Sequence, residues 1–418
     1  MKALTIENIC RACGGELIGN AADDREASCV VIDSRKMEPG GVFIATKGEQ
    51  VDGHSFIPQV FENGALAVVC EEAPADAAGP CIVVRDSFKA LTAIAAFYRK
   101  QLSCRFIGIT GSVGKTSTKE MTAAVLGQKY KVLYTEGNYN NEIGVPLTIL
   151  RIREDHECAV VEMGINHFGE MSRLTALVHP DIALITTIGE CHLEALHDRD
   201  GVLKAKTEIF EGMSDDGIAV LNGEDDKLRS VSRKGTVFYS LDDGLDTSFI
   251  PGRHMQLNAH GAAAVGRLLG VDDDKITEGL KGFQAMKGRG GIVKCPDYNV
   301  IDDCYNANPT SVKASIDMLC ETFASGRVAI LGDMFELGKN EAAFHASVGA
   351  YAKEKGVEEL IAVGALSKNM AEAFGDARYY ESTDALIAAL PGMDLKGKII
   401  LVKASHGMHF EKVIEALT

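Results

Sequence analysis

Short runs of apolar residues alternate with segments of helical periodicity along most of this chain. In the middle of the chain these runs are continuous, which is typical of strands that are buried on both faces of a parallel sheet. They lie at residues 106–109, 158–163, 181–187 and 217–221. The pattern therefore predicts an α/β fold with a buried parallel sheet in the middle of the chain.

The first part of the chain has a different pattern of apolar and polar residues. Residues 1 to about 84 are rich in turns and carry short apolar runs at 42–45 and 65–70. Helices are predicted at 6–13 and at 87–98 from their periodicity and from the residues that precede them. We expect a small α/β domain over residues 1–84.

A glycine-rich segment at 287–291 interrupts the pattern and is a candidate hinge. Strand-like runs return after it at 299–303, 327–332, 360–363 and 398–402. The sequence thus predicts a central parallel-sheet domain over 85–288 and a Rossmann-like α/β domain over 289–418. A chain of 418 residues is long enough for three domains, each with its own core.

Composition narrows the class of protein. No apolar run approaches the ~18–20 residues of a membrane span, although the chain is 46% hydrophobic. The N-terminus lacks an apolar signal region and the 11 cysteines suit reduced thiols, so we expect a cytoplasmic protein. We also expect a monomer, although the sequence itself does not give the oligomeric state. Cys10 and Cys13 form the only close pair in the sequence. We favour a packing role for both on the apolar face of a helix over zinc binding or redox chemistry. The net charge of −16 argues against nucleic acid as a partner.

The segment 105–118, RFIGITGSVGKTST, carries the clearest chemical signal. A short apolar strand runs into a loop with Gly111 and Gly114, and Lys115 and Thr116 precede a helix-prone segment. Glycines let backbone N–H groups turn around an anion, and a helix start adds a positive dipole. An isoleucine replaces the first glycine of the strict phosphate-loop pattern, so a chance match is the alternative. The flanking strand and helix favour a nucleoside triphosphate site, with Lys115 at the β/γ-phosphates and the Thr116 hydroxyl on Mg²⁺.

Further polar residues follow the predicted strands, where open α/β sheets bind ligands. Glu162 ends one strand and could hold Mg²⁺, although an ordinary strand-end acid is an equal alternative. His192 follows the next strand, and a structural role is the commoner one for a lone histidine. Lys204 and Lys206 lie two residues apart in a helical segment, so they cannot share a face, and one could point inward.

An asparagine-rich loop at 137–144 is the fourth polar cluster. Its amide side chains, including Asn138 and Asn141, could hold a substrate or orient the loop. The alternative is an ordinary turn.

Taken together, the order and spacing of these features resemble the Mur ligase family, ATP-dependent amide-bond synthetases of peptidoglycan assembly. The most specific strings follow the hinge, at 302–311 (DDCYNANPTS) and 331–338 (LGDMFELG). They look like the branch that adds D-alanyl-D-alanine to a UDP-N-acetylmuramoyl-tripeptide. Strings at 33–36, 42–48 and 52–54 are similar to the UDP-binding segment of that branch.

The resemblance implies ATP and Mg²⁺ as cofactors, with Lys115, Lys206 and His192 as the catalytic groups. The residues implied at ATP are Gly111, Ser112, Val113, Gly114, Lys115, Thr116, Ser117, Asn258, Arg289 and Asp303. Those implied at the metal are Thr116, Glu162, His192 and Lys206. Those implied at the UDP-sugar peptide and the dipeptide are Ser34, Arg35, Lys47, Gly48, Asp52, His54, Asn138, Asn141, Tyr305, Asn306 and Asn308. Lys206 matches a lysine that family members commonly carry as a carbamate, an oxygen ligand for a second Mg²⁺.

The chain departs from the family pattern at three positions. Ser112 replaces the usual threonine of the phosphate loop, a loss of one methyl group. Met255 stands where an asparagine is common, which weakens any role in holding adenine there. His406 stands where many members carry arginine, which changes the charge expected on that part of the substrate site.

The implied chemistry is transfer of the ATP γ-phosphoryl group to a carboxylate, followed by attack of an amine on the acyl phosphate. Within the superfamily, the alternatives are the tripeptide-forming amino-acid ligase and a folylpolyglutamate synthetase. The string at 306–309 and the UDP-type first region argue against both. A phosphate-loop nucleotide switch is the alternative from another class, but it would not need a third α/β domain. The third residue of the acceptor peptide, lysine or diaminopimelate, stays open.

Overall fold

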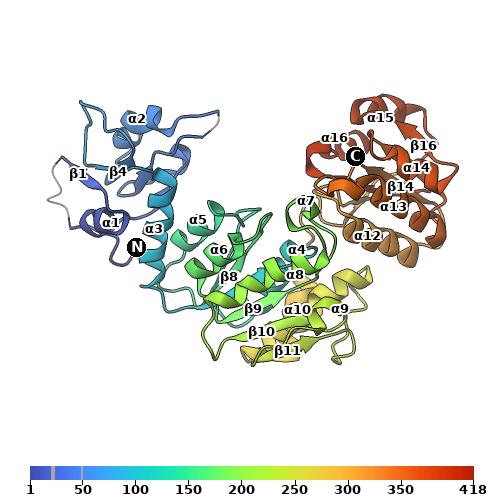
Figure 1. Ribbon diagram of the computed structural model, residues 1–418, viewed down its shortest axis with the longest axis horizontal. Coiled ribbons are helices and arrows are strands. Elements are labelled where there is room, and N and C mark those ends of the chain that lie inside the picture. The colour runs from blue at the N-terminus through green and yellow to red at the C-terminus, as the bar shows by residue number, and fades with distance from the viewer. Residues whose placement is uncertain (20–23, 49) are drawn as a thin grey trace.

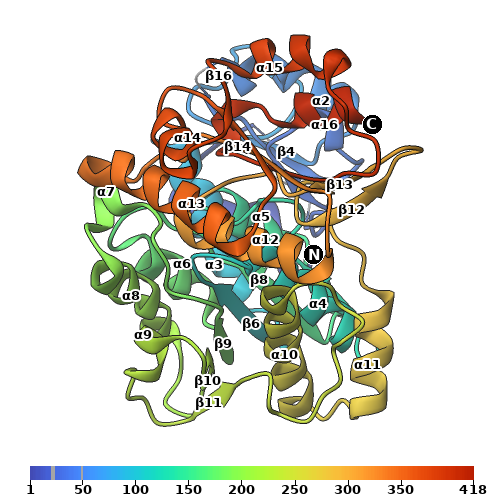
Figure 2. The same ribbon diagram turned by 90° about the vertical axis from the view of Figure 1, so that its right-hand side faces the viewer.

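The structure is a computed structural model that describes residues 1–19, 24–48 and 50–418. Three lobes form an open V, in which the first and third lobes both stand on the middle one (Figure 1). Turned by 90°, the third lobe lies in front of the first, above the central sheet (Figure 2). Each lobe is built around one sheet, so the predicted three-domain α/β fold is confirmed.

The first lobe has a five-stranded sheet in which only β1 runs antiparallel to its neighbour. The strand order is β1 (Glu16–Ile18), β5 (Cys81–Val83), β4 (Ala67–Cys70), β3 (Val42–Ile44) and β2 (Val30–Val31). The helical segments are α1 (Ile6–Cys13), η1 (Ser34–Lys36), η2 (Gly53–Phe56) and α2 (Ile57–Glu62). Thr5 caps α1 by accepting from the Asn8 amide, and Gly14 ends it in the left-handed region.

The middle lobe has a six-stranded sheet whose strands are all parallel. The order is β11 (Thr236–Tyr239), β10 (Ile218–Asn222), β9 (Ile182–Ile185), β6 (Arg105–Thr110), β8 (Cys158–Glu162) and β7 (Val132–Tyr134). The helical segments are α3 (Ser87–Arg99), α4 (Lys115–Leu126), α5 (Gly144–Leu150), α6 (Glu170–Val178), α7 (Leu193–Leu196), α8 (Arg199–Thr207), η3 (Glu208–Gly212), α9 (Asp226–Arg229), α10 (Arg253–Leu268) and α11 (Asp273–Gly282).

Both faces of the central sheet are covered, which explains its continuous apolar runs. Phe106 packs in the core that includes α3, α5 and α6. Ile107 and Ile109 pack in the opposite core with α4, α10 and α11. The strands β8 and β9 are the two neighbours of β6, so the carboxyl ends of three parallel strands meet at one edge.

The third lobe has a six-stranded sheet, parallel except for the edge strand β12. The order is β12 (Gly291–Lys294), β13 (Asn299–Asp302), β17 (Ile399–Lys403), β14 (Arg327–Gly332), β15 (Glu359–Val363) and β16 (Arg378–Tyr380). The helical segments are α12 (Pro309–Thr322), η4 (Gly338–Asn340), α13 (Glu341–Lys355), α14 (Lys368–Phe374), α15 (Thr383–Ala389), η5 (Leu390–Gly392), η6 (His406–Met408) and α16 (Glu411–Leu417).

The joints between the lobes involve the segments at which we place the domain boundaries. The helix α3 contacts α1 of the first lobe and α5 of the middle lobe, so the boundary at 84/85 stays a prediction. The candidate hinge 287–291 runs into β12, and the boundary at 288/289 also stays a prediction. No helix in the described part of the chain is long and apolar enough to cross a membrane.

Candidate active site

The phosphate loop lies between the end of β6 and the start of α4, as the sequence predicts. Its glycines adopt positive φ angles, +148° at Gly111 and +83° at Gly114, which residues with a side chain rarely adopt. Space is also lacking, because a Cβ atom on Gly111 would lie 1.9 Å from Thr186 Oγ1. On Gly114 it would lie 2.4 Å from Asn258 Oδ1. Only glycine therefore fits at these two positions.

Two threonines that follow β9 fix the Val113 carbonyl of this loop. Thr186 and Thr187 donate from Oγ1 to the Val113 carbonyl at 2.5 Å and 3.2 Å. No side chain caps α4 at Gly114, and the first-turn amides of a helix have no intrahelical acceptor, so they suit an anion. Lys115 Nζ donates to the Gly111 carbonyl at 2.9 Å, which folds the ammonium over the loop. Burial lowers the pKa of Lys115, and the nearby Glu162 carboxylate opposes that lowering.

Glu162 ends β8 beside the loop, with 1% of its surface exposed. Its Oε1 accepts from Thr116 Oγ1 at 3.2 Å and from Asn140 Nδ2 at 2.8 Å. Its Oε2 is buried and has no hydrogen-bond partner among the described residues. A buried carboxylate oxygen without a donor is costly, and oxygen ligands are those that Mg²⁺ prefers. Glu162 and Thr116 therefore fit a magnesium ion.

The two lysines of α8 point in opposite directions, which confirms that one of them lies inward. Lys206 is 1% exposed, and burial together with the charge of Lys115 lowers its pKa to about 8. Lys204 is exposed, and its ammonium lies 5.6 Å from the centre of the Phe168 ring. The structure thus places Lys206 close to the phosphate loop and Lys204 away from it.

His192 reaches the third lobe in this structure. Its Nδ1 lies 2.5 Å from Glu336 Oε2, an ion-pair distance between two lobes. Among the described residues, no three His, Cys, Asp or Glu side chains gather as a metal centre. The metal role of His192 therefore stays a prediction.

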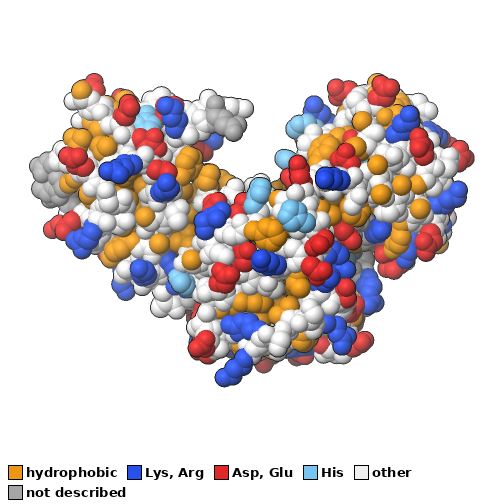
Figure 3. All heavy atoms as spheres, in the orientation of Figure 1, with side chains coloured by type: hydrophobic (Ala, Val, Ile, Leu, Met, Phe, Trp, Pro, Cys, Tyr) orange, Lys and Arg blue, Asp and Glu red, His pale blue; other side chains and the backbone are white. Residues whose placement is uncertain are grey.

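One cavity of about 1280 Å³ joins the middle and third lobes. Figure 3 shows the molecule hollowed between its two arms, above the middle lobe. The predicted site residues that line the cavity are Ser112, Val113, Gly114, Lys115, Thr116, Ser117, Asn141, Glu162, His192, Asn258, Arg289, Asp303, Tyr305, Asn306 and Asn308. The cavity thus brings together groups that are up to roughly 200 positions apart in the chain, because strand ends of two sheets face each other.

An ion pair between buried Lys403 and partly buried Asp303 holds the wall that the third lobe contributes. Lys403 Nζ lies 2.6 Å from Asp303 Oδ2, and Ser315 Oγ donates to the same oxygen at 2.6 Å. The Arg289 guanidinium lies 3.8 Å from the centre of the Tyr305 ring, so these two predicted residues are stacked. Sequence reasoning missed Lys403, although the neighbouring strands β13 and β17 bring it beside Asp303.

The asparagine-rich loop places a different residue at the site from those predicted. Asn140 bonds to Glu162, whereas Asn138 is exposed on the surface. Asn141 lines the cavity, but its Oδ1 accepts from the Ile143 and Gly144 amides and so opens α5. The substrate roles of Asn138 and Asn141 stay predictions.

The predicted UDP residues lie apart from this cavity, at the carboxyl ends of β2 and β3. Those that the structure places there are Ser34, Arg35, Lys47, Gly48, Asp52 and His54. Arg35 makes a two-point ion pair with Asp33, at 2.9 Å and 2.8 Å. His54 Nδ1 lies 2.7 Å from Asp52 Oδ1, and its Nε2 accepts from the Glu71 amide at 2.9 Å. These contacts orient the edge of the first sheet, and the nucleotide role stays a prediction.

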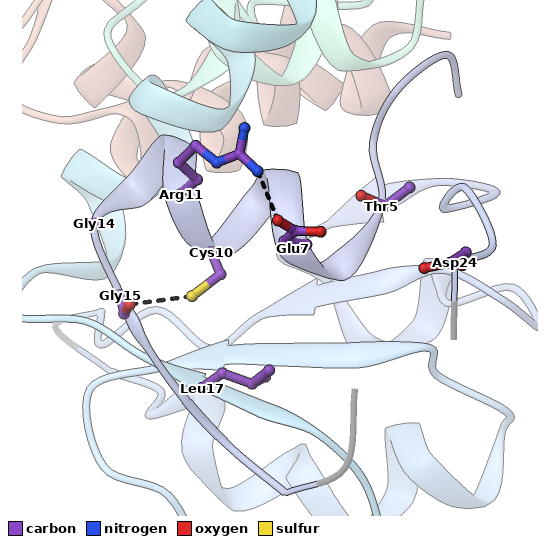
Figure 4. A pocket seen from close by; sticks show the side chains of 8 residues that line it. All are labelled: Thr5, Glu7, Cys10, Arg11, Gly14, Gly15, Leu17 and Asp24. Atoms are coloured by element: carbon purple, nitrogen blue, oxygen red, sulfur yellow. Dashed lines mark hydrogen bonds and ion pairs between the residues drawn. The ribbon is translucent and has the colours of Figure 1, made fainter. Parts of the chain in front are cut away.

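A smaller cavity of about 500 Å³ lies beside α1 and contains none of the predicted site residues (Figure 4). Arg11 pairs with Glu7 at 2.7 Å, and Cys10 Sγ donates to the Gly15 carbonyl at 3.1 Å. Burial raises the pKa of the Cys10 thiol, so this thiol stays protonated near neutral pH. These contacts are consistent with packing rather than redox chemistry for this cysteine.

Known proteins share these features over most of the chain. The family models that match are the Mur ligase family catalytic domain at residues 26–99, the Mur ligase middle domain at 109–250 and the Mur ligase glutamate ligase domain at 288–406. The UDP-N-acetylmuramoyl-tripeptide–D-alanyl-D-alanine ligase of Bacillus subtilis (strain 168) is 36% identical, over 99% of this chain and 98% of that protein.

Two crystal structures have the same overall fold. MurF from Acinetobacter baumannii superposes with a TM-score of 0.86 at 30% identity, covering 99% of this chain and 98% of that one. MurF ligase from Thermotoga maritima in complex with ADP has a TM-score of 0.79 at 28% identity, covering 93% of this chain and 96% of that one. With this similarity over nearly its whole length, and with the phosphate loop and Glu162 at one cavity, the chain belongs to the Mur ligase family.

Proposed function

We propose that this chain is an ATP-dependent, ADP-forming ligase that joins D-alanyl-D-alanine to the terminal carboxylate of UDP-N-acetylmuramoyl-tripeptide. The product is the UDP-linked pentapeptide used in peptidoglycan synthesis. Whole-length similarity to relatives with this named activity supports the proposal. The observation that carries it is the cavity in which the phosphate loop and Glu162 face the wall formed by residues 303–308.

The loop and the start of α4 would hold the triphosphate. The amides after Gly111 would donate to the phosphates, and Lys115 would offset charge that develops on the transferred phosphoryl group. Asn258 lies beside the phosphate loop, whereas Arg289 and Asp303 line the same cavity from the far side, and these three residues would complete the ATP site.

Glu162 and the Thr116 hydroxyl would hold Mg²⁺ beside the phosphates. When bound, the ion would neutralise phosphate charge and help to orient the phosphates for in-line transfer. The orphaned Oε2 of Glu162 supports this assignment. His192 would have to leave Glu336 before it could join a metal site.

Lys206 would act as its carbamate rather than as an amine. Carbamate formation needs a neutral amine, and burial lowers the pKa of Lys206 to about 8. The carbamate oxygens would then serve a second Mg²⁺ beside the first. Lys206 itself is buried close to Lys115, as such a role requires.

The two arms of the molecule would hold the two substrates that are joined. The strand ends of the first lobe offer Arg35, Lys47 and His54 to the uridine nucleotide, since Arg and Lys are the usual partners of phosphate. Tyr305, Asn306 and Asn308 would form the dipeptide side of the cavity. We also propose that the enzyme works in the cytoplasm as a monomer.

A product assay tests the function. Purified protein, ATP, Mg²⁺ and D-alanyl-D-alanine are incubated with the tripeptide nucleotide in its lysine or its diaminopimelate form. We expect pentapeptide, ADP and phosphate in equal amounts, and phosphate release only when both acceptor and dipeptide are present. Nucleotide hydrolysis without either would favour a switch, and use of a single amino acid or a folate would favour another ligase of the superfamily.

The role of Lys206 has its own test. Lys206→Ala should be nearly inactive, and a small added carboxylic acid should restore part of the rate by supplying the missing oxygens. Lys204→Ala is the matched control and should keep most of the activity. Wild-type rates for Lys206→Ala, or an inactive Lys204→Ala, would contradict the assignment.

A further inference from the structure

The loop 188–194, which follows β9 and includes the first two residues of α7, packs against the phosphate loop with one of its faces. The Gly189 amide donates to Ser112 Oγ at 2.9 Å, and Ser112 Oγ donates back to the Gly189 carbonyl at 3.3 Å. Cys191 Sγ donates to the same hydroxyl oxygen at 3.2 Å. Loop 188–194 and the phosphate loop are therefore held together through one buried serine, which is 8% exposed.

The other face of loop 188–194 contacts the third lobe. The Glu190 amide donates to Thr310 Oγ1 at 3.1 Å, and the same hydroxyl donates to the Glu190 carboxylate. The Glu194 amide donates to the Glu336 carbonyl at 3.3 Å, next to the pair between His192 and Glu336. The Thr310 hydroxyl thus uses both its donor and its acceptor capacity on a single residue of the middle lobe.

This contact is tight and both of its sides are anchored. A Cβ atom on Gly189 would lie 2.3 Å from Thr310 Oγ1, so the third lobe sits directly on the backbone of the loop. On the middle-lobe side, the Ile188 amide donates to Asp225 Oδ2 at 2.7 Å. On the third-lobe side, Asn308 caps the start of α12 by accepting from the Ser311 amide at 2.8 Å. Two anchored surfaces in close contact define one relative position of the lobes.

We infer that Thr310 is a positioning residue for the ligation reaction. Asn308 and Ser311, on either side of it, line the cavity, whereas the Thr310 side chain is bonded to Glu190. Seating Thr310 on loop 188–194 sets the position of the dipeptide wall relative to the phosphate loop. The inference rests on the proposed function, because the positioned groups are those that would hold the two reactants.

The effect follows from the geometry of the contact. Without the Thr310 hydroxyl, the third lobe keeps its own fold but loses two hydrogen bonds to the middle lobe, one of them to a carboxylate. The third-lobe wall of the cavity then occupies its correct position only part of the time. The KM for the dipeptide therefore rises and kcat falls. ATP analogue binding should fall less than dipeptide binding, because the phosphate loop keeps its bonds to Gly189, Thr186 and Thr187.

The matched pair Thr310→Val and Thr310→Ser tests the inference. Valine keeps the shape and removes the hydroxyl, whereas serine keeps the hydroxyl. We expect Thr310→Val to lose ~10–100-fold in kcat/KM for the dipeptide, the loss typical of hydrogen bonds to a charged group. Thr310→Ser should stay within about threefold of wild type, since the hydroxyl is retained. The KM for the tripeptide nucleotide should be nearly unchanged in both variants.

Two further measurements keep the outcome clear. Glu190→Ala removes the carboxylate that accepts from the Thr310 hydroxyl but keeps the Glu190 amide bond, so the double variant with Thr310→Val should lose no more than Thr310→Val alone. Small-angle scattering of the ligand-free proteins should show a wider spread of lobe positions for Thr310→Val than for Thr310→Ser, whether or not they ligate. Equal activity and scattering of wild type and Thr310→Val, or equal defects in both Thr310 variants, would overturn the inference. Wild-type protein that fails to ligate either tripeptide form would instead refute the proposed function.

Discussion

Lys206 carries an ammonium group that the fold buries, and replacing it should stabilise the protein while abolishing ligation. Burial lowers the pKa of this side chain from 10.5 to about 8, so the unfolded chain binds the proton more tightly than the folded chain does. Linkage converts this difference into about 3 kcal/mol of lost stability at pH 7. Methionine has a similar length and no charge, so Lys206→Met should gain ~1–3 kcal/mol at pH 7, part of the difference being offset by imperfect packing.

The sign of the pH dependence is fixed by the same difference in proton binding. Between pH 8 and 10.5 the unfolded chain holds more protons at Lys206, so the stability of the wild type rises with pH across this window. Below pH 8 the folded protein carries the full loss of stability that comes from burying the charged Lys206. The advantage of Lys206→Met should therefore be constant from pH 6 to 7.5, and it should shrink as the pH rises towards 10.5.

Urea unfolding, followed by circular dichroism because the chain has no tryptophan, measures this advantage. The buffers are depleted of carbon dioxide so that the wild-type amine stays free. Lys204→Met is the control, since its ammonium is exposed and its loss should change stability by less than about 0.5 kcal/mol. A Lys206→Met protein that is less stable than wild type at pH 7, or whose advantage does not shrink at high pH, would refute the reasoning.

Four further outcomes are expected. Lys115→Ala should lose at least ~10²-fold in the ligation rate, because one preorganised charge at the phosphates is gone, and near-normal ligation would contradict the phosphate-loop assignment. Gly114→Ala should raise the KM for ATP, since its φ of +83° and the side chain of Asn258 both exclude a methyl group; unchanged ATP kinetics would show that the loop can rearrange. Arg35→Ala should raise the KM for the UDP substrate and leave that for ATP nearly unchanged, and equal changes in both would remove Arg35 from the nucleotide site. Burial lowers the pKa of His345 below 6.5, so its contribution to stability is lost as the pH falls below that value; urea melts at pH 7.5 and 5.5 should show a smaller loss for His345→Gln than for wild type.

The sequence predicts the parts of the site that are local in the chain. The phosphate loop is a contiguous strand, turn and helix start, so its glycines and Lys115 are recognisable from their spacing together with the flanking strand and helix. The buried strands are equally clear, because both faces of the central sheet are covered. The short strands β1, β2, β7 and β16 were not predicted, since two or three residues carry too little pattern to tell a strand from a loop.

Contacts between distant segments could not be predicted in this way. Lys403 lies beside Asp303 because β13 and β17 are neighbours in the sheet. In the sequence, however, most of the third lobe lies between these two strands. In the loop 137–144 the sequence pattern does not show which asparagine points to the site. In the structure the Asn141 side chain bonds to the Gly144 amide of its own loop, and Asn140 is the residue that bonds to Glu162. The contact of Thr310 with Glu190 depends on how two lobes meet, for which the sequence has no local signal.

Glu162 Oε2 has no hydrogen-bond partner among the described residues, and if it holds Mg²⁺ as proposed, cation binding and folding are reciprocal events in the middle lobe. A cation that reaches this oxygen only in the native fold raises the free energy of unfolding by RT ln(1 + [cation]/Kd). The concentration of divalent cations would then set the stability of the middle lobe even when no nucleotide or peptide is bound. Chelation would weaken the fold of this lobe as well as slow its chemistry, so loss of activity in a chelator would report two effects at once.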